Sequence, residues 1–137
     1  MAVYVTDTHP LIWYTAGRHS RLSPRAVKIF DAAFAEQALV VIPSPVFWEI
    51  SLLVQHGRIK LRESFDQWTA ALISRRGLDV AALDVDVISE AHRLTFNGDP
   101  FDRAIVATAR LMDLQLISKD TAIRVSASID LIPQIRL

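Results

Sequence analysis

Short apolar runs alternate along this chain with longer stretches of helical pattern. The apolar runs lie near residues 3–6, 39–42, 80–83, 114–118 and 129–132. Strand-sized runs separated by helix-sized segments indicate βαβ units, in which each helix returns the chain to the next parallel strand. The sequence therefore predicts an α/β fold built on a parallel sheet. Because 137 residues are enough for one such unit, we expect residues 1–137 to form a single domain.

Capping residues, proline and glycine mark the expected helices. We place helix starts at Thr8 or His9, Ser23-Pro24, Ser44-Pro45, residue 64, residue 86, Asp99-Pro100 and Thr121. A serine or aspartate followed by proline is typical of a helix start, because the first side chain accepts a free N–H and proline fits the first turn. We therefore predict that Ser44 caps the third helix. Gly77 is expected to follow the helix that starts at residue 64.

Composition excludes several kinds of protein. The chain has no cysteine, which rules out disulfides and thiolate metal sites, so a metal would need oxygen or histidine ligands. It shows neither a secretion signal nor an apolar run of about 18 residues, so we expect no membrane contact and a cytoplasmic location. The net charge of zero is unlike that of a dedicated nucleic-acid binder. Basic residues such as Arg18 and Arg21 are nevertheless clustered.

Acidic residues follow two of the expected strands. Asp7 follows the first strand and Asp120 follows the strand near residues 114–118. Open α/β sheets bind ligands beyond the carboxyl ends of their strands. Asp99 and Asp102 lie at a helix start, where capping and the helix dipole also favour acids. Capping is equally open as a role for Asp7 and Asp120.

Glu49 is the acid that capping does not explain. Its neighbours on the same helix face are all apolar, namely Pro45, Val46, Leu52 and Leu53. A charge there is costly unless it is paired or bound to a metal. Crowded carboxylates favour a hard divalent cation, and the combination indicates metal-assisted hydrolysis of a phosphate ester.

Two other classes of function stay open at this point. A phosphatase or phosphotransferase could use the same scaffold, but a haloacid-dehalogenase-like site requires a second aspartate where His9 lies. A receiver-like site would use Asp84 and Lys119, which fit only loosely. A non-catalytic binding module would make the acids helix caps, and Glu49 argues against it.

Four stretches of the chain resemble the PIN-domain ribonucleases, and closely the VapC toxins of bacterial toxin–antitoxin pairs. They are residues 5–9 (VTDTH), 44–50 (SPVFWEI), 98–103 (GDPFDR) with 107–109 (ATA), and 116–120 (LISKD). The resemblance implies a three-layer α/β/α PIN-like domain whose parallel sheet has the strand order 3-2-1-4-5. It also implies a Mg²⁺- or Mn²⁺-dependent endoribonuclease that acts as the toxin of such a pair.

The resemblance assigns roles residue by residue. It implies Asp7, Glu49, Asp102 and Asp120 as the catalytic acids and metal ligands, with Asp99 beside them as a further ligand and Ser118 in a supporting role. Where Asp99 and Asp102 must be separated, we assign the cap to Asp99 and the metal side to Asp102. Arg18, Arg21 and Arg103 are candidates to hold RNA at the rim. The implied partners are an RNA substrate, a cognate antitoxin and a second copy of the chain in a homodimer.

Aromatic residues gather near the helix starts around these acids. Trp13, Tyr14, Phe47 and Trp48 are the residues concerned, and we expect most of them in the core. At least one should be exposed in the isolated chain and covered by a protein partner, because aromatic side chains anchor interfaces.

Overall fold

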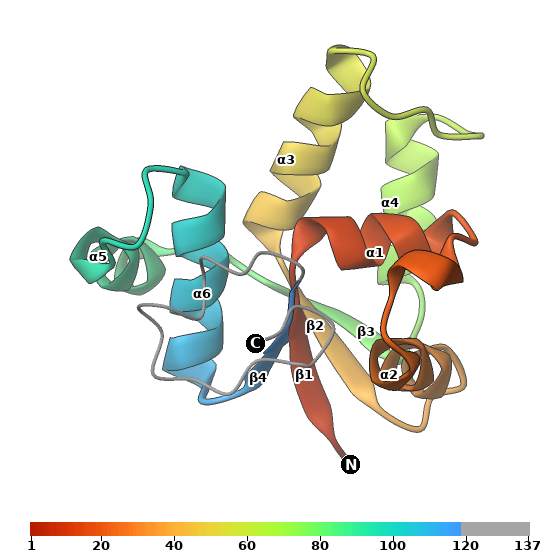
Figure 1. Ribbon diagram of the computed structural model, residues 1–137, viewed down its shortest axis with the longest axis horizontal. Helices are drawn as coiled ribbons and strands as arrows, with labels where there is room; N and C mark the ends of the chain where they lie inside the picture. The colour runs from red at the N-terminus through yellow and green to blue at the C-terminus, as the bar shows by residue number, and fades with distance from the viewer. Residues whose placement is uncertain (119–137) are drawn as a thin grey trace.

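A computed structural model describes residues 1–118 of the chain (Figure 1). Its strands are β1 (Val3–Thr6), β2 (Leu39–Pro43), β3 (Leu78–Ala81) and β4 (Gln115–Ile117). Its α-helices are α1 (Thr8–Thr15), α2 (Pro24–Phe34), α3 (Ser44–Gln55), α4 (Phe65–Ile73), α5 (Val85–Arg93) and α6 (Pro100–Met112). A short 3₁₀ helix spans His19–Arg21 between α1 and α2.

The described strands form one parallel sheet of order β3-β2-β1-β4. β1 pairs with β2 through Val5 and Val41, and with β4 through Val5 and Leu116. The α/β class and the order of the first four strands are confirmed. The fifth strand expected near residues 129–132 and the helix expected at Thr121 lie outside the described residues.

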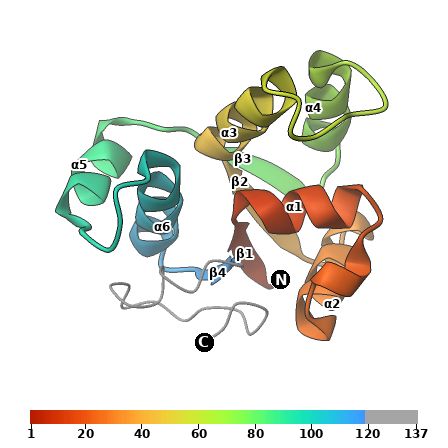
Figure 2. The ribbon, with the colours of Figure 1, turned by 45° about the horizontal axis from the view of Figure 1, so that its top comes forward.

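Helices cover the sheet from two sides. α6 contacts β1, β2 and β4, whereas α2 contacts β2 and α4 contacts β3. Figures 1 and 2 show α5 and α6 on one side of the sheet, with α1, α2 and α4 on the other. Right-handed crossovers produce this arrangement, because the chain moves outward from β1 to β3 and then returns to the far side of β1.

The core lies between the sheet and its helices. Strand residues Val5, Val40, Ile42, Leu116 and Ile117 have no exposed surface. They pack in one apolar cluster with Phe30 of α2, Ile50 of α3 and Ile105 of α6. A strand buried on both faces is apolar along its whole length, which is why these runs do not alternate with polar residues.

Two details differ from the sequence-based expectation. Ser44 is the first residue of α3 and not its cap, since its Oγ accepts the Leu83 N–H at 3.0 Å. β3 begins at Leu78, two residues earlier than expected, so Gly77 leads directly into a strand. In both cases a contact distant in the sequence decides the local structure.

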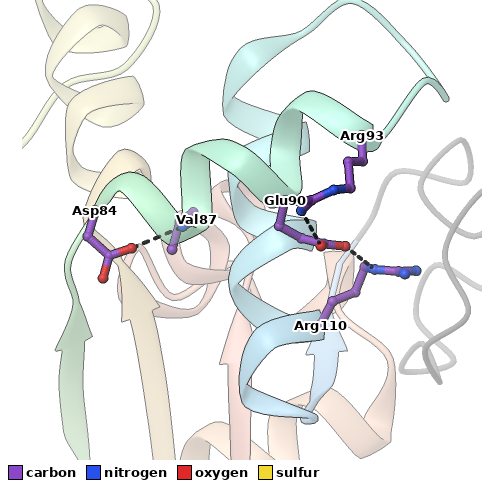
Figure 3. A network of polar contacts seen from close by, with 5 residues as sticks. All are labelled: Asp84, Val87, Glu90, Arg93 and Arg110. Carbon is purple, nitrogen blue, oxygen red and sulfur yellow. Dashed lines mark hydrogen bonds and ion pairs between the residues drawn. The ribbon is translucent and has the colours of Figure 1, made fainter.

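An ion-pair network joins α5 to α6, as Figure 3 shows. Arg110 donates from Nε to Glu90 at 2.9 Å, and Arg93 donates to the other oxygen of the same carboxylate at 3.3 Å. Asp84 caps α5 by accepting the Val87 N–H. Because Glu90 and Arg110 are largely buried, their bond is worth more than an exposed pair and fixes α5 against α6.

Tyr14 joins α1 to α2. Its ring stacks on Phe30, with ring centroids 4.9 Å apart, and its hydroxyl donates a hydrogen bond to Asp31. Burial, reinforced by the bond to Asp31, raises the pKa of Tyr14 to about 12. Tyr14 therefore stays protonated and keeps this contact throughout the neutral pH range.

No helix within residues 1–118 is long and apolar enough to cross a membrane.

Gly77 is the position where packing leaves no room for a side chain. A Cβ built there would lie 1.7 Å from the backbone oxygen of Ala33, an atom that cannot rotate away. We expect Gly77→Ala to lower the free energy of unfolding in urea by roughly 3 kcal/mol, at the upper end of typical overpacking costs. Gly98→Ala is the matched control, since nothing lies within 4 Å of its Cβ, and it should change stability by less than about 1 kcal/mol. Equal effects of the two substitutions would contradict this reading.

Candidate active site

Asp7 lies at the carboxyl end of the central strand. Its N–H donates to the Ile117 carbonyl at 2.8 Å and so extends the pairing with β4. Its Oδ1 accepts the Thr8 N–H at 2.7 Å, which makes it the cap of α1. Its Oδ2 accepts the Ser118 hydroxyl at 2.8 Å. Asp7 is therefore both a helix cap and a carboxylate held beside the end of β4, with only 3% of its surface exposed.

Glu49 reaches the same place from α3. The Thr8 hydroxyl donates to its Oε1 at 2.6 Å, so one residue at the start of α1 contacts both Asp7 and Glu49. The side chain is partly buried on the apolar face that the sequence indicated. Its contact with Thr8 joins residues 41 positions apart in the sequence.

Asp102 lies in the first turn of α6. Its Oδ2 accepts a hydrogen bond from the Asn97 side-chain amide at 3.2 Å. Asp99 caps the helix, as we expected, because its Oδ1 accepts the N–H groups of Phe101 and Asp102. The Trp48 and Phe101 rings meet edge to face at 5.4 Å, which places this turn beside α3.

The three acids therefore belong to elements that meet at one edge of the sheet. α1 and α3 begin at the carboxyl ends of β1 and β2, and α6 begins nearby (Figure 1). Thr8 hydrogen-bonds to both Asp7 and Glu49, and Ser118 hydrogen-bonds directly to Asp7. Packing of α6 against α3 places the turn that carries Asp102 beside α3. Asp120, the fourth predicted acid, lies outside the described residues.

Two polar residues at the site were missed by the sequence analysis. Thr8 was read only as a possible helix start, and Asn97 only as part of a chain break before α6. The position of Thr8 directly after Asp7 was a signal, but its partner Glu49 is not predictable from sequence spacing. Asn97 also accepts the Asp99 N–H at 2.8 Å, so it joins the loop before α6 to the helix itself.

The candidate RNA-contacting arginines differ in their exposure. Arg18 and Arg21 are exposed, and the Arg21 guanidinium lies 5.7 Å from the centre of the Trp13 ring. Arg103 is partly buried and donates to the Leu94 carbonyl at 3.2 Å. Its Nε is buried without a hydrogen-bond partner in the described part of the chain. The role of all three in binding RNA stays a prediction.

The chemistry of the acids suits a hard divalent cation, because carboxylate oxygens are the ligands that Mg²⁺ and Mn²⁺ prefer. Within residues 1–118, no three histidine, aspartate or glutamate side chains are grouped closely enough to hold a metal ion. The donor type therefore fits, and a complete ligand set would have to draw on residues beyond 118, where Asp120 lies.

A comparison with family models decides which family these residues belong to. The PIN domain model matches residues 4–127, which include all of the site described above. The chain belongs to the PIN-domain family. PIN domains are generally nucleases and typically depend on divalent metals. No curated protein sequence matches this PIN domain.

Solved structures share the fold of this PIN domain. VapBC2 from Rickettsia felis, bound to a DNA fragment from its promoter, is 15% identical with a TM-score of 0.67, covering 95% of this chain and 97% of that chain. A toxin–antitoxin complex from Klebsiella pneumoniae is 18% identical with a TM-score of 0.64, covering 98% and 99%. FitAcB from Neisseria gonorrhoeae is 16% identical with a TM-score of 0.65, also covering 98% and 99%. At these identities the likeness establishes the fold.

The cap of α6 can be tested separately from the rest of the site. We expect Asp99→Ala to lower the free energy of unfolding by about 1 kcal/mol, because two backbone N–H groups lose their acceptor. Asp99→Asn should have little effect, since asparagine caps about as well as aspartate. Chemical denaturation of both variants measures the difference. Similar losses in the two variants would show that the negative charge of Asp99 matters more than its capping oxygen.

Proposed function

We propose that this PIN domain is a metal-dependent endoribonuclease and the toxin of a toxin–antitoxin pair. The observation that carries the proposal is that Asp7, Glu49 and Asp102 lie on three elements that meet at the carboxyl edge of a parallel sheet: Asp7 caps α1, Glu49 lies in α3, and Asp102 lies in the first turn of α6. That edge lies at the topological switch point, because β1 has β2 on one side and β4 on the other. Membership of the PIN family supports a nuclease over the phosphatase and binding-module alternatives.

The chain's own residues would hold the metal ion, orient the carboxylates and bind the RNA backbone. Asp7, Glu49, Asp102 and Asp120 are the proposed catalytic acids, and together with Asp99 they are the proposed holders of Mg²⁺ or Mn²⁺. When bound, such an ion supplies a water activated for attack and charge to stabilise the leaving oxygen. The Ser118 hydroxyl would keep the Asp7 carboxylate in one orientation. Arg18 and Arg21, exposed on the α1 side, would contact the phosphate backbone of the RNA.

Substitution of the acids tests the nuclease proposal. We expect cleavage of RNA with Mg²⁺ or Mn²⁺, and none after removal of the metal with EDTA. Asp7→Asn and Asp102→Asn should each lower the cleavage rate by more than about 100-fold, beyond what changes around a ligand typically cost. Both variants should remain as stable as the wild type, because one charge fewer relieves repulsion and, in Asp7→Asn, asparagine still caps α1.

A matched control is available in α5. Asp84 also caps a helix that follows a strand, and its Oδ1 accepts the Val87 N–H, but it is exposed and on a different part of the fold. Asp84→Asn should therefore cleave RNA at the wild-type rate. Cleavage by metal-free protein, or near-normal rates in Asp7→Asn, would refute the proposal. Sequencing RNA 5′ ends after brief expression, with Asp102→Asn for comparison, would identify the RNA that is cut.

The partners follow from the toxin assignment. The structural neighbours come from toxin–antitoxin complexes, which supports a protein antitoxin for this chain. We further propose that the chain forms a homodimer, acts as a single domain and works in the cytoplasm, where its RNA substrate would lie. None of these assignments requires a membrane.

Trp48 provides a probe for the antitoxin. Trp13, Tyr14 and Phe47 pack partly buried against the core, whereas Trp48 is 59% exposed beside Glu49, so the expectation of an exposed aromatic is confirmed. We expect a shift of tryptophan fluorescence to shorter wavelength when the antitoxin binds, because binding removes the indole from water. Trp48→Phe should lose most of that shift while keeping the fold. An unchanged spectrum on adding antitoxin would show that Trp48 lies outside the interface.

A further inference from the structure

Thr8 contacts two of the proposed catalytic acids. Its backbone N–H donates to Asp7 at 2.7 Å, and its hydroxyl donates to Glu49 at 2.6 Å. The side chain has no exposed surface, so water does not compete for the hydroxyl. The backbone bond would form with any residue at this position, whereas the bond to Glu49 requires a hydroxyl.

The hydrogen bond from the Thr8 hydroxyl restrains the Glu49 side chain, which could otherwise adopt several rotamers. Glutamate has three rotatable side-chain bonds, and a charged end next to apolar neighbours would otherwise turn toward water. A hydrogen bond from a neutral donor to a carboxylate is short and comparatively strong. At 2.6 Å the Thr8 bond is of this kind, so it selects one orientation of Glu49. The two residues lie on different helices, because Thr8 begins α1 and Glu49 lies in α3.

We propose that Thr8 is a positioning residue, whose hydroxyl holds the Glu49 carboxylate in the orientation that divalent-metal binding requires. This assignment rests on the proposed metal-dependent function and extends it to a residue outside the acid set. Around metal sites, residues that orient the ligands typically contribute 10- to 100-fold to metal affinity. The alternative is that the hydroxyl serves only to satisfy a partly buried carboxylate and so affects stability alone.

Substitutions at Thr8 can separate these two roles. Thr8→Val keeps the shape but removes the donor, Thr8→Ser keeps the donor, and the backbone N–H to Asp7 is present in both. Thr108→Val is a matched control, because Thr108 is equally buried and its hydroxyl donates at 2.8 Å to the Ala104 carbonyl within α6. Each variant is compared with the wild type by Mn²⁺ titration calorimetry and by urea unfolding without metal.

A positioning role predicts a specific pattern of Mn²⁺ affinities. Thr8→Val should bind Mn²⁺ about 10- to 100-fold more weakly, while Thr8→Ser and Thr108→Val bind within about threefold of the wild type. In a Glu49→Gln background, Thr8→Val should add little further loss, because its effect passes through Glu49. If Thr8→Val is too unstable to purify, Thr8→Ala removes the same donor without adding a methyl group in its place.

The outcomes distinguish this assignment from the proposed function. If the wild type does not bind Mn²⁺, the metal-dependent function fails and the role of Thr8 fails with it. If the wild type binds Mn²⁺ and folded Thr8→Val binds it equally well, only the positioning role is overturned. The positioning role would also be overturned if Thr8→Val lowers the Mn²⁺ affinity by the same factor in the Glu49→Gln background as in the wild type.

Discussion

The arrangement of the site depends on the parallel pairing of β1 with strands on both sides. β1 hydrogen-bonds to β2 and to β4, so its end is flanked by the starts of helices that come from distant parts of the sequence. Backbone pairing continues one residue beyond β1, where the Asp7 N–H donates to Ile117. This bond fixes the backbone of Asp7 relative to β4 and brings Ser118 within reach of its carboxylate. The side-chain contacts of Asp7 with Thr8 and Ser118 build on that fixed position.

Each of the three catalytic acids proposed within residues 1–118 receives a hydrogen bond from a neutral side chain. Ser118 donates to Asp7, Thr8 to Glu49 and Asn97 to Asp102. Such donors orient a carboxylate and satisfy part of its hydrogen-bonding capacity while leaving its negative charge in place. That charge is what would attract a divalent cation, so the arrangement combines fixed geometry with retained charge.

A capping role does not exclude the proposed catalytic role at this site. Asp7 caps α1 with one oxygen while its other oxygen accepts from Ser118, and Asp99 caps α6 three residues before Asp102. A helix start that follows a strand end needs an acceptor for its free N–H groups, and aspartate supplies one. The same position lies at the carboxyl edge of the sheet, so one aspartate can serve both the fold and the proposed chemistry. This explains why the capping alternative could not be dismissed from the sequence.

The sequence by itself determined the fold class, the order of the elements and the residue types of the site. Apolar runs of strand length predict buried parallel strands, because both faces of such strands are covered. Ser23 and Asp99 mark the starts of α2 and α6, because each caps its helix through a local hydrogen bond. Glu49 was recognisable because a charge on an apolar helix face needs a partner. Tertiary structure decided which residue that partner is, since Thr8 lies 41 positions away and meets Glu49 only when α1 and α3 start side by side. Tertiary structure also decided where β3 begins and paired the Ser44 hydroxyl with the Leu83 N–H, because long-range contacts override local signals where the two compete.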